Sequence, residues 1–169
     1  MATLKSGGGT ISLFNGPMPL VAVAANREAE ETTVSNWLED RIGEGLTPQE
    51  MSVIVRSDQQ IDRARRAVES AGSTAKVLDE RVDATVGRVS ICTTHLAKGL
   101  EFRAVAVMAC DDGEIPKQSR LEAVSDNSDL EEVYSTERHL LYVACTRARD
   151  YLIVSGVDPA SEFLDDLRG

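Results

Sequence analysis

Short aliphatic runs alternate along the chain with longer segments whose apolar residues recur at helical spacing. The aliphatic runs predict strands at residues 20–24, 51–55, 76–78, 89–93, 103–109 and 151–155. The helical spacing predicts helices after Asn26, after Ser57, over residues 129–149 and over residues 159–167. This alternation predicts a doubly wound, mostly parallel α/β sheet with helices on both faces.

The first predicted helix has a clear start and a buried stripe. Asn26 is a good N-cap residue, and the acids at positions 28, 30 and 31 favour the positive end of a helix. Trp37 lies on the apolar stripe that also contains Val34 and Leu38. We therefore expect Trp37 to be part of the core and not a platform for stacking bases.

The second predicted helix carries an S-x-x-Q pattern, in which Ser57 and Gln60 predict a capping box. Its apolar stripe is aliphatic, so we expect its three arginines, Arg63, Arg65 and Arg66, to lie on the solvated side.

The segment from Thr93 to Phe102 reads T-T-H-L-A-K-G-L-E-F and joins two predicted buried strands. A connection that only reverses the chain needs Gly, Asn, Asp or Pro, and not a His, a Lys and a Glu so close together. The alternative is a polar loop with one helical turn. We expect a functional segment at the carboxyl ends of the strands, where doubly wound sheets bind ligands. Phe102 is predicted to be core.

Composition limits the class of protein. The chain has 169 residues, 42% of them hydrophobic and only 4% aromatic, which fits one domain with an aliphatic core. Three cysteines stand apart without a C-x-x-C pattern, so we expect buried, reduced thiols and a cytoplasmic location. No long apolar run predicts a membrane span. The net charge of −10 argues against a protein that wraps nucleic acid with its whole surface.

Three further features of the sequence bear on function. Residues 1–18 contain a Gly-rich stretch without the Lys of a phosphate-binding loop, so we expect a flexible or edge-lying leader before a single domain at residues 19–169. No G-x-G-x-x-G follows the first strand, which argues against a dinucleotide-binding module. Residues 111–127 read as a long acidic loop.

Three segments together carry a family resemblance. Residues 93–102 resemble motif V of the UvrD/Rep-type superfamily-1 DNA helicases, and E-R-H-L-L-Y-V-A-C-T-R-A-R at residues 137–149 resembles their motif VI. V-I-V-R-S-D at residues 53–58 is similar to a strand-and-Arg segment earlier in the same domain. The resemblance covers about residues 20–156.

The resemblance implies a RecA-like (P-loop NTPase-like) fold and a place in a larger motor. In this family ATP binds with Mg²⁺ between two RecA-like domains, and this chain resembles the C-terminal one. The phosphate-binding loop belongs to the N-terminal RecA-like domain, which is the implied partner, and no G-K-[ST] occurs in this chain. The accessory domain that usually interrupts the C-terminal domain is absent between residues 56 and 93. No metal site is expected on this chain.

The resemblance assigns four residues to the nucleotide. Arg147 resembles the arginine that contacts the γ-phosphate across the domain cleft, and a planar guanidinium is well shaped for two phosphate oxygens. Glu101 resembles the acceptor of a ribose hydroxyl, and Gly99 lets the backbone approach the nucleotide. Lys98 could reach either the nucleotide or the DNA. The alternative for Arg147 is an ordinary arginine at a helix C-terminus.

Three residues are assigned to DNA, which is expected to be single-stranded or partially duplex. Thr93 and His95 resemble contacts to the strand backbone, and Arg56 belongs to the earlier segment that faces DNA. His95 has a core or capping histidine as its alternative. The chain departs from the family pattern at two positions: Asp58 replaces a common Asn and would repel phosphate, and His139 replaces a second Arg.

Two functional hypotheses follow. The first is the C-terminal motor domain of an ATP-dependent DNA helicase, which is inactive as an ATPase when isolated. The second is a stand-alone remnant that binds nucleic acid or a protein without hydrolysing ATP. The acidic surface slightly favours the second, and the two long motifs favour the first.

Overall fold

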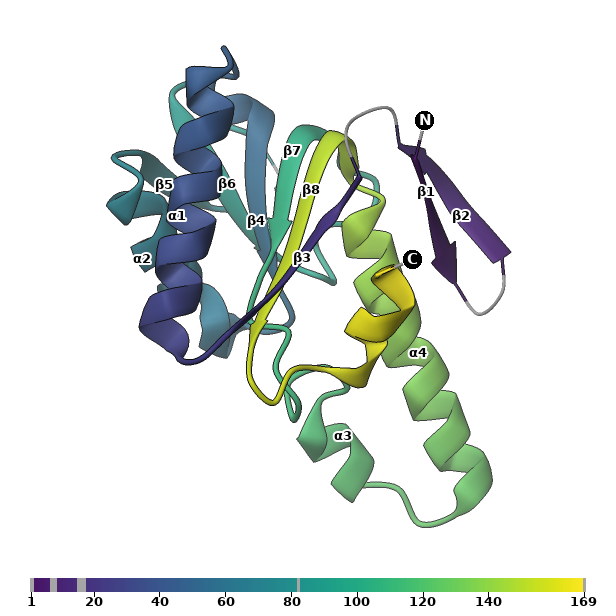
Figure 1. The fold of residues 1–169 in the computed structure, drawn as a ribbon. Coiled ribbons are helices and arrows are strands. Elements are labelled where there is room, and N and C mark those ends of the chain that lie inside the picture. The colour runs from purple at the N-terminus through teal and green to yellow at the C-terminus, as the bar shows by residue number, and fades with distance from the viewer. Residues whose placement is uncertain (1, 7–8, 15–17, 82, 169) are drawn as a thin grey trace.

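A twisted parallel sheet forms the centre of the protein, with helices on both of its faces (Figure 1). The computed structural model describes residues 2–6, 9–14, 18–81 and 83–168. In these residues the large sheet has six strands in the order β3-β8-β7-β4-β6-β5, and every described pair is parallel. The predicted doubly wound sheet is therefore confirmed.

The elements agree well with the predicted positions. The strands of the large sheet are β3 (Leu20–Ala24), β4 (Met51–Val55), β5 (Thr74–Val77), β6 (Arg88–Thr93), β7 (Phe102–Val107) and β8 (Ala148–Val157). The α-helices are α1 (Arg27–Gly43), α2 (Ile61–Ser70), α3 (Gln118–Glu122) and α4 (Asn127–Cys145). Three 3-10 helices are η1 (Pro48–Glu50), η2 (Asp58–Gln60) and η3 (Glu162–Leu167).

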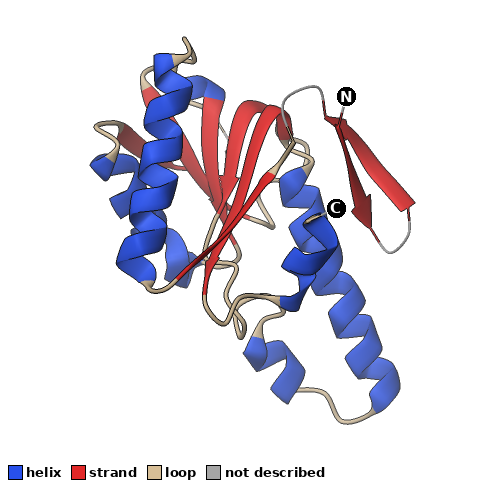
Figure 2. Cartoon of the chain, viewed as in Figure 1, coloured by secondary structure: helices blue, strands red, loops and turns tan. Residues whose placement is uncertain are grey.

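The two faces of the sheet bury separate cores. Helices α1 and α2 cover one face, where Trp37 is 5% exposed and belongs to the core as predicted (Figure 2). Helix α4 and η3 cover the other face, where Phe102 is also buried as predicted. The central strands β4, β6 and β7 face helices or loops on both sides, and this explains their continuous aliphatic sequences.

Three details of the helices differ from the predictions. Helix α4 ends at Cys145, and the residues from Ala148 onward form β8, so the strand begins three residues earlier than predicted. The acidic stretch at residues 111–127 contains the short helix α3. The capping box at Ser57 does not form, because its side chain makes no cap hydrogen bond. A capping interaction occurs instead at η1, where the Glu50 carboxylate accepts hydrogen bonds from the amide and hydroxyl of Thr47.

A separate hairpin precedes the large sheet. Strands β1 (Ala2–Ser6) and β2 (Gly9–Phe14) pair antiparallel, and β1 lies beside α4 and η3 (Figure 1). The sequence predicted no strand here. Part of the Gly-rich stretch, including Gly7 and Gly8, lies outside the described residues, and the division into a leader and a domain at residues 19–169 stays a prediction.

The three cysteines are buried and unpaired, at Cys92, Cys110 and Cys145. Burial raises the pKa of Cys92 to about 11 and that of Cys145 to about 12, so these thiols are protonated near neutral pH. Within the described residues, no helix has the length and apolar character needed to cross a bilayer.

Candidate functional site

The segment from Thr93 to Phe102, here called the crossing segment, runs along the strand direction. It starts where the parallel strands end, here called the carboxyl edge, and finishes where they begin, here called the amino edge. Thr93 is the last residue of β6 and lies beside Val55, at the carboxyl edge. Phe102 is the first residue of β7 and pairs with Ala148, at the amino edge. Since β6 and β7 are parallel, their connection has to travel the length of a strand. The predicted location at the carboxyl edge is therefore correct only for the start of the segment.

The crossing segment lies on the same face of the sheet as α4. Ala97 is buried in the core that contains the α4 residues Leu141 and Cys145, and Leu96 and Leu100 pack against that core. Two short turns shape the path, with the amide of Ala97 donating to Thr93 and the amide of Leu100 donating to Ala97. The apolar side chains thus anchor the segment, and its charged and imidazole side chains, at Lys98, Glu101 and His95, are exposed.

At the carboxyl edge, the two predicted DNA contacts differ in exposure. His95 is exposed, whereas Thr93 is only 8% exposed. Thr94 is buried, and its amide donates to the carbonyl of Val55 at 2.9 Å, which holds the start of the segment against the end of β4. His95 is therefore the residue of this end whose side chain reaches solvent.

At the amino edge, the end of the crossing segment meets the start of β8. Lys98, Gly99 and Glu101 are exposed, and the amide of Phe102 donates to the carbonyl of Arg147 at 2.9 Å. Gly99 has a φ of +86°, which favours glycine, although a Cβ there would meet only open space. The fold alone therefore needs Gly99 for its backbone conformation.

Arg147 lies just beyond the end of α4 and is half-buried. Its Nη2 donates to the hydroxyl of Thr146 at 3.0 Å. Its Nε is buried and has no hydrogen-bond partner in the part of the chain that the structure describes. A buried donor without an acceptor costs free energy, so a hydrogen bond from this guanidinium to an anionic oxygen would offset that cost.

A shallow hollow of about 380 Å³ lies next to Glu101 at the amino edge. Its polar lining includes Glu50, Arg103 and Arg149. Arg103 is already paired with Asp150 at 2.8 Å and with Glu50 at 3.4 Å, so its charge is largely compensated. This hollow adds polar surface beside the predicted ribose contact.

Arg56, predicted to face DNA, is a buried residue at the end of β4. Its side chain is paired with Glu137 of α4 through two hydrogen bonds, of 3.0 Å from Nε and 2.8 Å from Nη2. Its Nη1 lies 3.2 Å from Nε2 of His95. We call this set, with the further partners of Glu137, the Arg56 network. It joins the residues that the sequence assigned to three separate motifs.

Glu137 is the centre of the Arg56 network, with a side chain that is fully buried. It also accepts hydrogen bonds from the amide of Lys117 at 2.7 Å and from Arg120 at 2.9 Å. Burial raises the pKa of this carboxyl, but the hydrogen bonds from Arg56, Lys117 and Arg120 outweigh burial and lower the pKa below its ordinary value of 4.5. Glu137 is therefore an ionised, fully hydrogen-bonded carboxylate.

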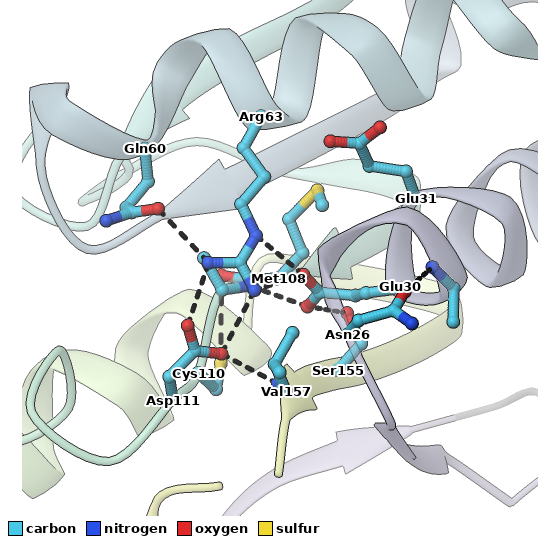
Figure 3. A network of polar contacts seen from close by, with 12 residues as sticks. Asn26, Glu30, Glu31, Gln60, Arg63, Met108, Cys110, Asp111, Ser155 and Val157 are labelled. Atoms are coloured by element: carbon cyan, nitrogen blue, oxygen red, sulfur yellow. Dashed lines mark hydrogen bonds and ion pairs between the residues drawn. The ribbon is translucent and has the colours of Figure 1, made fainter. Parts of the chain in front are cut away.

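A second buried arginine, Arg63 of α2, is the centre of another network at the same edge (Figure 3). Its Nε donates to Glu30 at 2.8 Å, and its two terminal nitrogens donate to Asp111 at 2.8 and 3.1 Å. Gln60 accepts one more hydrogen bond from it. The second oxygen of Glu30 accepts hydrogen bonds from Ser155 and from the amide of Ala109, and we call this set the Arg63 network.

The solvated position predicted for Arg63 is wrong, since the residue is 2% exposed. Burial lowers the pKa of its guanidinium, but the hydrogen bonds to Asp111 and the charge of Glu30 outweigh burial and raise that pKa. Arg66 is exposed and Arg65 half-buried. The sequence did contain a signal, because the apolar Ala67 stands one helical turn after Arg63 and therefore on the same helix face.

Together, the structure brings the seven predicted site residues into two groups. Glu101 and Arg147 lie at the amino edge, with Lys98 and Gly99 shortly before Glu101 in the chain, and Thr93, His95 and Arg56 lie at the carboxyl edge. Sequence reasoning missed Glu137 as the residue that links the second group to α4. Among the described residues, no group of His, Cys, Asp and Glu side chains could hold a metal ion.

The sequence profile of the UvrD-like helicase C-terminal domain matches residues 73–158, which is just over half of the chain. The chain belongs to this family. The matched residues include the whole crossing segment and all of α4, so the UvrD-like domain contains both ends of the candidate site.

Named relatives agree with this assignment. Over 69 residues the UvrD-like domain is 46% identical to YjcD of Bacillus subtilis, whose name describes an ATP-dependent DNA helicase. Over 77 residues it is 42% identical to the ATP-dependent DNA helicase UvrD1 of Mycobacterium tuberculosis. These alignments cover 40% and 46% of this chain but only 9% of each relative, so the matched parts are about a tenth of the relatives' length.

A solved structure matches over more of the chain. It is the C-terminal domain of a possible DNA helicase from Lactobacillus plantarum WCFS1, with a TM-score of 0.66 and 26% sequence identity. The match covers 90% of this chain and 81% of that one. The chain therefore has the fold of a helicase C-terminal domain over nearly its whole length.

Proposed function

We propose that this UvrD-like domain is the C-terminal motor domain of an ATP-dependent superfamily-1 DNA helicase. The observation that carries the proposal is the course of the crossing segment, which places His95 near its start at one edge of the sheet and Glu101 near its end at the other. One end is available to a DNA strand and the other to a nucleotide. A short, anchored connection of this kind links the two sites mechanically.

At the amino edge we propose that ATP binds between this domain and an N-terminal RecA-like domain. The half-buried guanidinium of Arg147 donates to a γ-phosphate oxygen, and its charge stabilises the γ-phosphate oxygens as the bond to the departing ADP breaks. Glu101 accepts a hydrogen bond from a ribose hydroxyl, Gly99 gives the backbone access, and the exposed Lys98 adds positive charge beside the phosphates.

Mg²⁺ would enter with ATP and be bound mainly by the N-terminal RecA-like domain, where it would neutralise phosphate charge. This chain contributes the arginine, and it lacks a G-K-[ST] phosphate-binding loop. We therefore expect the isolated chain to have no ATPase activity. Its closure onto the N-terminal domain is what brings Arg147 to the phosphates.

At the carboxyl edge we propose contact with single-stranded or partially duplex DNA, made first by His95. Thr93 stays a predicted contact whose hydroxyl is buried in this domain, and Arg56 acts from a buried position. Binding of a strand through its backbone is sensitive to salt and largely independent of sequence. A cytoplasmic location, proposed from the three unpaired cysteines, fits such a role.

The test is a substitution in the helicase assembled from both RecA-like domains. Arg147→Ala should lower kcat for ATP hydrolysis by about 10³-fold or more while single-stranded DNA still binds with nearly unchanged affinity. Arg88→Ala, an exposed arginine at the start of β6, is the matched control and should change neither. Hydrolysis that survives Arg147→Ala would exclude the proposed role of Arg147.

The second candidate, a binding module without ATP hydrolysis, makes the opposite prediction. It requires DNA or protein binding by the isolated chain and no stimulation of hydrolysis when the N-terminal RecA-like domain is added. The exposed acid Asp58, two residues after Arg56, is the observation that favours it, because a carboxylate there weakens binding of phosphate. Titration of the N-terminal domain with this chain, with ATP turnover as the readout, separates the two.

A further inference from the structure

The contact between Arg56 and His95 defines the hydrogen-bonding state of the histidine. Nη1 of Arg56 lies 3.2 Å from Nε2 of His95. A guanidinium has only donors and stays protonated in proteins, so Nε2 has to be the acceptor. Acceptance at Nε2 leaves the ring hydrogen on Nδ1. This Nδ1–H belongs to an exposed side chain and has no protein partner in the described part of the chain.

We infer that Arg56 and Glu137 are positioning residues, which hold His95 with its Nδ1–H free to donate to a phosphate oxygen of a DNA strand. The inference rests on the proposed function for its ligand, since the phosphate belongs to the strand that we propose at the carboxyl edge. It adds two residues to that site, neither of which touches the DNA.

Arg56 is itself fixed on all sides. Two of its nitrogens are bonded to the fully buried carboxylate of Glu137, and its side chain is 6% exposed. Its positive charge is compensated there, so it has neither the exposure nor the free charge for a direct phosphate contact. The single nitrogen left over, Nη1, is the one that faces His95.

Glu137 extends this support to other elements. Its oxygens also accept from the amide of Lys117 and from Arg120, which lie in and before α3. The carboxylate therefore joins the end of β4, helix α4 and the loop before α3 around one histidine. A shift of α4 would move Glu137, then Arg56, and through Arg56 the ring of His95.

The first experiment measures the tautomer directly. In the ¹⁵N-labelled chain, two-bond ¹H–¹⁵N correlation spectra of the two histidines report which ring nitrogen carries hydrogen. We expect His95 to have an unprotonated Nε2 and a protonated Nδ1, and exposed His139 serves as the internal reference. A protonated Nε2 at His95 in the wild-type chain would overturn the inference without any variant or any DNA.

Two variants test the cause of the tautomer. Arg56→Met removes the donor and should shift His95 toward the tautomer of free histidine while His139 stays unchanged. Glu137→Gln keeps the shape but loosens Arg56, and should produce a smaller shift in the same direction; it also serves if Arg56→Met does not fold. An unchanged His95 tautomer in a folded variant of either kind contradicts the positioning role.

The second experiment uses single-stranded DNA and fluorescence anisotropy. His95→Ala should weaken binding about tenfold, Arg56→Met by a similar factor, and the double variant by no more than either. The slope of log K against log salt should be equal in wild type and Arg56→Met. A direct phosphate contact by Arg56 would instead reduce that slope by about 0.7 and give additive losses, which would overturn the inference.

The two proposals fail in different ways. If the wild-type chain shows the expected tautomer but binds no single-stranded DNA, with or without the N-terminal RecA-like domain, the proposed function is wrong and the phosphate ligand of His95 is wrong with it. If DNA binds and His95→Ala has no effect, the helicase proposal survives and the positioning inference is overturned.

Discussion

Two buried arginines at the same edge of the sheet have similar partners and different surroundings. Arg63 bonds to Glu30 and Asp111, and Glu30 accepts further hydrogen bonds from the amide of Ala109, just after β7, and from Ser155 of β8 (Figure 3). Arg56 bonds to Glu137 in the same bidentate manner, but its last nitrogen faces the exposed His95. All three nitrogens of Arg63 bond to partly or fully buried protein groups, whereas the last nitrogen of Arg56 faces an exposed side chain.

The difference shows how to separate a structural arginine from a functional one. Bidentate pairing and low exposure are common to both, so neither property identifies a site. The two arginines differ in the partner of their remaining terminal nitrogen. For Arg63 this partner is Gln60 or Asp111, whereas for Arg56 it is the exposed His95, whose second ring nitrogen can still donate. We therefore expect substitutions in the Arg63 network to lower the free energy of unfolding. Substitutions in the Arg56 network should lower that free energy and also weaken DNA binding.

The largest effect on stability is expected from the Arg63 network. Glu30→Ala leaves the buried guanidinium without one of its two carboxylates and should lower the free energy of unfolding by about 3–5 kcal/mol. Urea denaturation followed by circular dichroism measures this. The control is Glu31→Ala, which breaks the pair with Arg66, whose side chain is 53% exposed, and should cost less than about 1 kcal/mol. Equal losses for the two variants would contradict a closed, structural network.

A smaller loss is expected from the Arg56 network. Glu137→Gln keeps the shape of the side chain but weakens its charge-assisted hydrogen bonds, and should lower the free energy of unfolding by about 1–3 kcal/mol at neutral pH. The same denaturation experiment measures it. If Glu137→Gln proved as harmful as Glu30→Ala, the Arg56 network would have to be counted as equally structural.

The pH dependence of stability distinguishes the same variant from wild type. The pKa of Glu137 is lowered in the folded state, so its contribution to stability is complete above the ordinary value of 4.5 and is lost as the pH falls through the lower, folded value. The wild-type chain should therefore lose more stability than Glu137→Gln below about pH 4.5. Melting temperatures from pH 7 down to pH 3 test this, and parallel curves would rule it out.

The smallest expected effect concerns the cysteines beside the two networks. Cys110 precedes Asp111 of the Arg63 network, and burial raises the pKa of its thiol well above the usual range. Cys92 precedes Thr93 at the start of the crossing segment. In variants that keep one cysteine, we expect a thiol reagent to modify Cys92 several-fold faster than Cys110, since the Arg56 network near Cys92 ends at the exposed His95 and the Arg63 network beside Cys110 does not. Equal rates would argue that both networks open together.

The sequence predicted most of the fold because its signals are local. The aliphatic run at 51–55 and the Asn26 cap each depend on neighbouring residues, and both were correct, with the Asn26 side chain accepting from the amide of Ala29 at 2.8 Å. The end of α4 at Cys145 was missed because Ala148 continues the apolar stripe of the helix, although it pairs with Phe102 as part of β8. Pairing with a distant strand decided that boundary.

The candidate site was predictable in its members and not in its geometry. The motifs predicted Arg147 and Glu101 as site residues. Their separation from His95 by the length of a strand follows only from the parallel arrangement of β6 and β7. The partners of Arg56 and Arg63 lie 81 and 33 residues away in sequence, at Glu137 and Glu30. No local pattern contains such contacts, since they exist only after the strands are placed.

The crossing segment also has to contain enough residues to span the length of a strand. The strand it accompanies has six residues, which is about 20 Å at 3.3 Å per residue. The nine Cα–Cα steps from residue 93 to residue 102 can reach at most about 30 Å, and two turns shorten that reach. The segment is a tether with little slack. After deletion of one residue between His95 and Glu101, the segment would no longer let both of its ends keep their positions. Insertion of one residue would let one end move without the other.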